Sequence, residues 1–234
     1  KSVCTISNSF INDLQIKDIN KKKCICYLTK KKSNENSNLI SKDIKNRFLS
    51  SLKIKIVFIG HFGTDVYDFK ILHKIKKFLV NSPNLEIYLF GDLNKNKEIL
   101  NMLNFKNLFI MNRVNSSEFH YICSKSQLVF LPIKNRFDFI KCLPNKFIDA
   151  LQYKLPIITC LKGEARKLIQ KYKLGFVYNN ASELKYILSS FSKKTKIDSI
   201  KKNFNHPDIK QMFDHDLNYK KLIDRIKSDI QTLG

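Results

Sequence analysis

The sequence predicts an α/β fold built on a doubly wound parallel sheet. From residue 54 to residue 178, short apolar runs alternate with longer amphipathic segments. The short runs are continuously apolar, which is typical of parallel strands buried on both faces. A chain of 234 residues is long enough for one sizeable core. Because right-handed crossover helices must cover such a sheet, we expect a Rossmann-like domain with flanking helices.

The expected elements of this domain follow one another without an internal repeat. The strands are expected at Ile54–Ile59, Leu85–Phe90, Leu108–Met111, Leu128–Leu131, Pro156–Thr159 and Phe176–Tyr178. The helical segments are expected at residues 71–79, 94–103, 116–124, 144–153 and 163–171.

Additional segments are expected on both sides of this domain. Ser2–Ile6 and Cys24–Leu28 resemble strands around a helix at about 8–17, and the polar stretch at 30–38 is typical of a linker. After the domain we expect two or three helices, and the last has an apolar stripe that requires a partner. The predicted division is 1–49, 50–192 and 193–234. Since the chain begins with Lys1, we expect a fragment of a longer protein.

The chain is strongly basic, with a formal net charge of +23 from 43 Lys and Arg against 20 Asp and Glu. Such a charge ordinarily indicates a nucleic acid or an anionic membrane as partner. The excess is nearly all lysine, accompanied by abundant Asn, Ile and Phe, as an AT-rich genome produces, and the arginines are few and scattered. We therefore expect no nucleic-acid partner, and we keep weak peripheral attraction to an acidic membrane as an alternative.

The spacing of the six cysteines bears on metal binding, and the hydropathy of the chain bears on its cellular compartment. No two cysteines have the two-residue spacing that zinc sites use, so we expect no metal site. The sequence contains neither a signal peptide nor an apolar run near 18 residues. We expect a cytoplasmic protein, either free or at the inner face of the membrane.

Loops after the strands are the first places to look for ligand contacts, because open α/β sheets bind ligands at the carboxyl edge. Gly60-His61-Phe62-Gly63 follows the first strand, where small residues let the backbone approach phosphates. A tight turn without a ligand is the alternative. Gly91-Asp92 and Arg113 follow the next two strands. Gly91 is more typical of a plain turn, and Arg113 is as compatible with a solvated charge as with a ligand contact.

The segment from Leu143 to Glu164 carries the strongest signal. Pro144 and Asn145 are typical of a helix start, whose free amides and dipole attract anions. Lys146 could complete a diphosphate site there. Asp149 shares a helix face with Lys146 and could accept hydrogen bonds from ribose hydroxyls. The alternative is a surface Lys–Asp pair without function.

This segment resembles the donor site of the family 4 glycosyltransferases, in which Pro-Asn-Lys leads into an acidic residue, a small-residue helix, Pro-Val-Ile and a Gly-Glu turn. The flanks are similar too: Phe58-Ile59-Gly60 to the first strand and glycine loop, and Tyr88 through Asp92 to the Gly-Asp-Gly strand exit. The likeness covers nearly the whole chain.

The resemblance implies the C-terminal half of a GT-B fold, which holds the nucleotide-sugar, with residues 1–49 ending the acceptor domain. Asp149 takes the place of the second motif glutamate, which contacts the ribose. The first motif glutamate falls on Lys141, and His61 stands where the family has an arginine, so Lys146 carries more of the diphosphate charge. The loops after Met111 and Leu131 would border the base.

The resemblance further implies glycosyl transfer from a nucleotide diphosphate-sugar, most simply a UDP-sugar, without a cofactor or metal. The acceptor would be a glycan or lipid-linked glycan in bacterial surface polysaccharide or glycolipid synthesis, and the catalytic residues would lie outside this chain. The expected contacts to the nucleotide-sugar are Gly60, His61, Phe62, Gly63, Arg113, Pro144, Asn145, Lys146, Asp149 and Glu164. The alternatives are a catalytically degenerate domain, a nucleotide-sugar epimerase or phosphorylase-like enzyme on the same GT-B architecture, and a basic nucleic-acid or membrane module.

Overall fold

The computed structural model describes residues 2–5, 22–25, 39–49, 53–62, 65–92, 97–192 and 195–231. Within these ranges a six-stranded, entirely parallel sheet has the order β5-β4-β3-β6-β7-β8. The strands are β3 (Ile54–Ile59), β4 (Leu85–Phe90), β5 (Leu108–Met111), β6 (Leu128–Leu131), β7 (Ile157–Thr159) and β8 (Gly175–Val177). The predicted doubly wound sheet is confirmed.

The direction of winding reverses between β3 and β6. From β3 the chain adds β4 and β5 on one side, and from β6 it adds β7 and β8 on the other. Ile54 pairs with Leu85 in β4, while Ile56 pairs with Leu128 in β6. Right-handed crossovers place the two sets of helices on opposite faces of the sheet. The switch point, where open α/β sheets usually bind their ligands, therefore lies at the carboxyl ends of β3 and β6.

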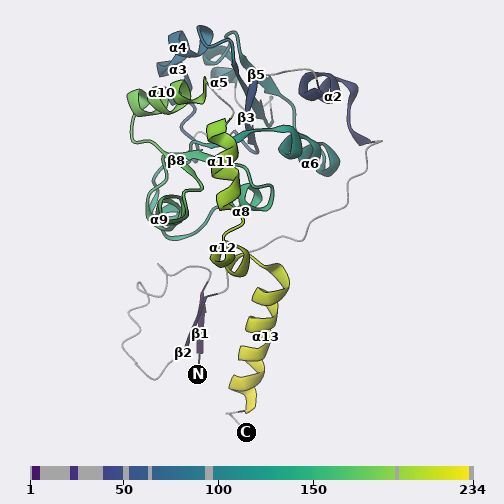
Figure 1. Cartoon of the computed structure of the whole chain (residues 1–234), viewed down its shortest axis with the longest axis vertical. Helices are drawn as coiled ribbons and strands as arrows, with labels where there is room; N and C mark the ends of the chain where they lie inside the picture. The colour runs from purple at the N-terminus through teal and green to yellow at the C-terminus, as the bar shows by residue number, and fades with distance from the viewer. Residues whose placement is uncertain are drawn as a thin grey trace.

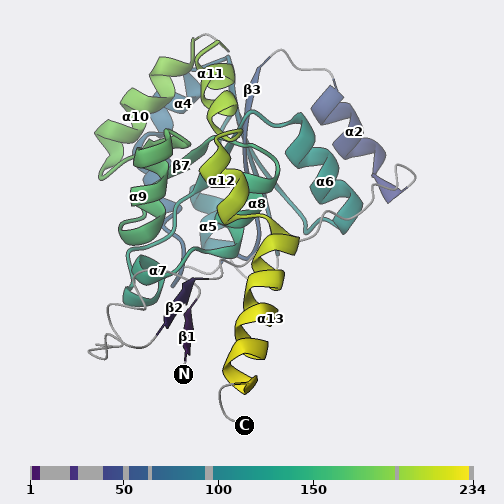
Figure 2. The same cartoon turned by 60° about the horizontal axis from the view of Figure 1, so that its bottom comes forward.

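Helices cover both faces of the sheet, as Figures 1 and 2 show. On one face they pack over alternate β3 residues such as Ile56 and Phe58 and form one apolar core. The helices of this face are α3 (Lys70–Lys74), α4 (Lys76–Val80), α5 (Lys97–Met102) and α10 (Ala181–Ser189). The opposite face packs around Val57, Val129 and Ile157. Its helices are α2 (Lys42–Leu49), α6 (Ser116–Lys125), α8 (Asn145–Gln152) and α9 (Gly163–Tyr172).

Some helix boundaries differ from the prediction. The single helix expected over 71–79 is two short helices, because the backbone at Ile75 departs from helical geometry (φ −106°, ψ 14°). An additional helix, α7 (Phe137–Lys141), precedes α8 and was not predicted. Pro144, expected in the first turn, is the N-cap of α8, with extended backbone (φ −60°, ψ 145°).

Three further helices end the chain: α11 (Thr195–Asn203), α12 (Pro207–Met212) and α13 (His215–Gln231). Ile197 of α11 and Ile209 of α12 are buried against the two main cores, so these two helices belong to the same packed unit. Helix α13 extends away from the sheet and contacts β1 (Ser2–Thr5) (Figures 1 and 2). In the described part of the chain, no helix combines the length and hydropathy that a bilayer crossing requires.

The N-terminal region contains a two-stranded parallel sheet of β1 and β2 (Lys22–Ile25). The predicted helix at 8–17 and the predicted linker at 30–38 lie outside the described residues. Helix α2 packs against α6 and the sheet through Ile44 and Phe48. Residues 39–49 are therefore packed against the sheet domain, and the predicted boundary at residue 50 remains a prediction.

Candidate functional site

The glycines at the ends of β3 and β4 bring two backbones together at the carboxyl edge. The Gly60 N–H donates to the Phe90 carbonyl (2.8 Å), and the Gly91 N–H donates to the Met111 carbonyl (3.0 Å). A Cβ added to Gly91 would lie 2.4 Å from the Gly60 carbonyl oxygen. Because that distance is far below a normal contact, no larger residue fits at Gly91 without a shift of the backbone. Gly91 thus serves close packing of the two loops.

Lys146 of α8 reaches over to Gly60. Its Nζ donates to the Ile59 carbonyl at 2.5 Å and lies 5.2 Å from the centroid of the Phe58 ring. A Cβ on Gly60 would lie 1.9 Å from this Nζ. The ammonium therefore occupies the space that the missing side chain of Gly60 leaves open. The predicted phosphate-binding lysine and the predicted phosphate-binding glycine lie in direct contact.

The start of α8 lies at the same edge, one residue before Lys146. Its N-cap is Pro144, whose side chain has no hydrogen-bonding atom and makes no capping bond. Asn145, the first helical residue, is exposed. The first amides of a helix carry a partial positive charge. In α8 the Phe147 N–H donates to the Pro144 carbonyl (2.8 Å), so the amides of Asn145 and Lys146 are the ones that precede the first such bond. The cation of Lys146 and the positive end of the α8 dipole are therefore adjacent.

Asp149 lies one turn further along α8, on the same face as Lys146. Both residues line a small cavity of about 20 Å³ under α8, together with Ile59, Cys123 and Leu131. Burial, with a smaller contribution from the Asp149 charge, raises the pKa of the Cys123 thiol well above its usual range. The structure thus brings Lys146, Asp149 and the end of β3 together.

The other predicted contacts have different surroundings. His61 is exposed, whereas Phe62 is 1% exposed and packs against Phe58 and Phe69. The Phe62 side chain therefore belongs to the core, and only its backbone could face a ligand. Gly63 lies outside the described residues. Glu164 is buried in the first turn of α9.

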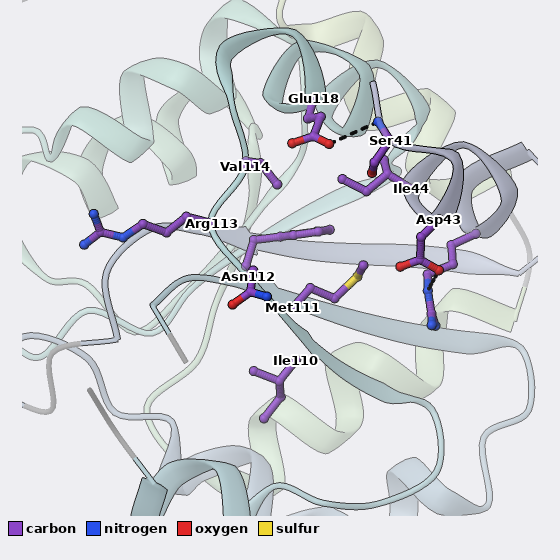
Figure 3. A pocket seen from close by; sticks show the side chains of 11 residues that line it. Ser41, Asp43, Ile44, Ile110, Met111, Asn112, Arg113, Val114 and Glu118 are labelled. Carbon is purple, nitrogen blue, oxygen red and sulfur yellow. Dashed lines mark hydrogen bonds and ion pairs between the residues drawn. The ribbon is translucent and has the colours of Figure 1, made fainter. Parts of the chain in front are cut away.

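Arg113 forms part of the edge of a larger cavity beside β5. Its guanidinium lies 3.7 Å from the Asp92 carboxylate and the side chain is 63% exposed, so it links the loops after β4 and β5. The cavity measures about 370 Å³ and lies between α2, the end of β5 and the start of α6. Figure 3 shows Met111 and Asn112 between Arg113 and Asp43, and the Arg113 side chain extends away from Asp43.

Backbone hydrogen bonds join two loops at the carboxyl edge, and the sequence did not predict this pairing. The Asp68 N–H donates to the Pro132 carbonyl and the Lys134 N–H to the Val66 carbonyl, both at 2.8 Å. Tyr67 and Ile133 form an isolated antiparallel bridge between the two loops. Burial, followed by the charge of Asp65, raises the pKa of Tyr67 to about 12. Loops 65–68 and 132–134, which follow β3 and β6, are therefore joined to each other. No local sequence pattern signals a pairing between residues so far apart in the chain.

Lys141, where the family resemblance predicts the first motif glutamate, ends α7 and is half-buried. A lysine there can donate hydrogen bonds to a ligand oxygen but cannot accept one from a hydroxyl. Next to the end of β3, the edge combines the Lys146 ammonium, the start of α8 and the Asp149 carboxylate. Such a set can hold a phosphate group and a hydroxylated ring next to it.

The fold has many solved relatives at low identity. A glycosyltransferase from Rickettsia africae ESF-5 is 16% identical with a TM-score of 0.68, and covers 97% of this chain. Anabaena Alr3699/HepE in complex with UDP is 15% identical with a TM-score of 0.70, also over 97% of this chain. Sucrose-phosphate synthase from Thermosynechococcus elongatus is 10% identical with a TM-score of 0.71 over 99%.

This chain spans 63%, 63% and 59% of the lengths of those three proteins, less than two thirds of each. No family model matches the sequence, and neither does any curated protein sequence. Identities this low establish the fold. The likenesses confirm the predicted fold class, a Rossmann-like parallel sheet with flanking helices.

Proposed function

We propose that this chain is the nucleotide-sugar-binding part of a glycosyltransferase, which transfers a sugar from a nucleoside diphosphate to an acceptor. The observation that carries the proposal is the contact between Lys146 and the end of β3. The ammonium of Lys146 lies against Gly60 at the switch point of the sheet, one residue after the start of α8. Ligands of open α/β sheets bind at this place.

The chemistry of the transfer explains why these groups suit the reaction. As the bond between the sugar and the diphosphate breaks, negative charge develops on the leaving diphosphate. A fixed cation and the positive end of a helix dipole stabilise that charge without a rearrangement of the protein. In this proposal Asp149, one turn along α8, accepts hydrogen bonds from the ribose, and the cavity next to Met111 and Asn112 receives the base.

Structural relatives support the ligand class. One of them was crystallised with UDP and, separately, with UDP-glucose. We propose a UDP-sugar as the substrate of this chain, with no cofactor. A glycan or lipid-linked acceptor, a role in surface polysaccharide or glycolipid synthesis and a cytoplasmic location at the membrane are further parts of the proposal.

Calorimetric titration of the 234-residue chain with UDP, GDP and ADP at low salt tests the nucleotide site. We expect UDP to bind and each of the variants Lys146→Ala and Asp149→Ala to weaken binding at least tenfold, which is about 1.4 kcal/mol. Lys167→Ala is the matched control, because it removes one exposed lysine of α9 and the same charge. Absence of nucleotide binding, or equal effects of Lys146→Ala and Lys167→Ala, would refute the proposal.

A further inference from the structure

A seam of polar and aromatic side chains joins α6 to the helix that carries Lys146 and Asp149. The α6–α8 seam consists of Phe119, His120 and Cys123 from α6, and of Asp149 and Tyr153 from α8. Cys123 follows Phe119 by four positions and His120 by three, and Tyr153 follows Asp149 by four, so each set shares one side of its helix. The face of α8 that points toward α6 is thus continuous with the proposed site.

Tyr153 is the C-cap of α8 and fixes this end of the helix. Its N–H donates to the Asp149 carbonyl (3.2 Å), which places it one turn after the proposed ribose ligand. Its hydroxyl forms a hydrogen bond with Nδ1 of the His120 ring and lies 3.2 Å from Nε2. The Tyr153 ring meets Phe119 edge-on, with centroids 5.6 Å apart. His120 itself is only 6% exposed.

The next pair along the seam is Cys123 and Asp149. The Cys123 side chain is 5% exposed and lines the same small cavity as Asp149. The two side chains therefore face one cavity between α6 and α8, and the charge of Asp149 contributes to the raised pKa of the Cys123 thiol. Any movement of α8 relative to α6 would change the position of Asp149 over this cavity.

We propose that His120 and Tyr153 are positioning residues, whose hydrogen bond sets the position of α8 and thereby of the Asp149 carboxylate toward the nucleotide. Neither side chain would touch the ligand. This inference rests on the proposed function, since it concerns the same site. Groups that hold ligand-binding side chains in place strengthen binding because the site needs no reordering when the ligand arrives.

The test compares Tyr153→Phe with Tyr172→Phe in the full chain. Both changes remove a single hydroxyl that bonds between helices: Tyr172 of α9 donates to the Asp208 carboxylate (3.0 Å). We expect Tyr153→Phe to weaken UDP binding at least threefold at 25 °C. Tyr172→Phe should leave it within twofold, although thermal melts should show a lower Tm for both variants. A purely structural role would lower Tm in both and leave the Kd unchanged.

A double-mutant cycle with Asp149→Asn tests whether Tyr153 affects UDP binding through the Asp149 carboxylate. If Tyr153 acts by placing the carboxylate, the weakening by Tyr153→Phe should fall below twofold in the Asp149→Asn background. Equal UDP affinity of Tyr153→Phe and the unchanged chain, or fully additive effects with Asp149→Asn, would overturn the inference while leaving the proposed function intact. Failure of the unchanged chain to bind UDP would overturn both.

Discussion

Replacing Gly60 by alanine isolates the contact between the end of β3 and Lys146. The added Cβ would lie 1.9 Å from Nζ and 2.5 Å from Cε of Lys146, so the ammonium must move by about 1.5 Å or more to reach an ordinary contact. The nearest atoms belong to the far end of a flexible side chain. We therefore expect the protein to fold, with the lysine displaced from its position against Ile59.

The size of the effect on binding follows from electrostatics. At an effective dielectric constant of about 20, moving a unit charge from about 4 Å to about 5.5 Å from a phosphate charge loses about 1 kcal/mol. Loss of one charge-assisted hydrogen bond adds about 1.5 kcal/mol. Gly60→Ala should therefore weaken UDP binding by tenfold to hundredfold, roughly. The φ of Gly60 is 157°, which strains an alanine, so the free energy of unfolding should fall by about 2 kcal/mol.

Calorimetry with UDP on a four-member cycle measures this prediction: the unchanged chain, Gly60→Ala, Lys146→Ala and the double variant. In the Lys146→Ala background no ammonium remains to be displaced, so Gly60→Ala should have an additional effect below twofold. If Gly60→Ala binds UDP as the unchanged chain does, or weakens binding equally in both backgrounds, the reasoning about Lys146 is refuted.

Three further predictions concern stability. Gly163→Ala should destabilise the fold by about 3 kcal/mol or more in urea denaturation, because the φ of 68° is left-handed and the Cβ would lie 1.8 Å from the backbone oxygen of Ile140; an unchanged midpoint would contradict this. Glu118→Ala should lower the free energy of unfolding by about 2 kcal/mol in the same assay, because the carboxylate accepts hydrogen bonds from the amides of Asn115 (3.1 Å) and Ser41 (3.2 Å). A decrease under about 0.5 kcal/mol would contradict this role of the two bonds. Because the pKa of Tyr67 is raised to about 12, the folded state keeps this proton longer than the unfolded state does, and stability should fall as pH rises from about 10 to 12. The full shift corresponds to about 2.7 kcal/mol of unfolding free energy, which the partial exposure of Tyr67 reduces to about 1 kcal/mol. In denaturant titrations at pH 9 and 11.5, the unfolding free energy of Tyr67→Phe should fall less between the two pH values than that of the unchanged chain. An equal fall in both proteins would exclude Tyr67 as the cause.

The strands were the most predictable part of the fold. Ile54–Ile59, Leu85–Phe90, Leu108–Met111 and Leu128–Leu131 match the observed strands residue for residue, because buried parallel strands require continuous apolar runs. Short helices were harder to place. The break at Ile75 and the start of α7 depend on packing against other elements, and neither Pro nor Gly marks them.

The candidate site was predictable where it depends on one helix. The shared face of Lys146 and Asp149 follows from helical periodicity, and both residues line the same cavity. The burial of Phe62 was not predictable, since a glycine-rich loop does not indicate whether an aromatic residue turns inward. The bond between Tyr153 and His120 joins residues 33 positions apart on different helices, and no local pattern signals it.

The central claim is that UDP binds at the end of β3 and the start of α8, and not diffusely on a chain with a net charge of +23. Titration of the ¹⁵N-labelled chain with UDP, followed by amide chemical shifts, tests it most directly. We predict saturable shifts that are largest at Gly60, His61, Asn145 and Lys146. Shifts that do not saturate, or that are largest at exposed lysines of α11 such as Lys196 and Lys202, would contradict the claim.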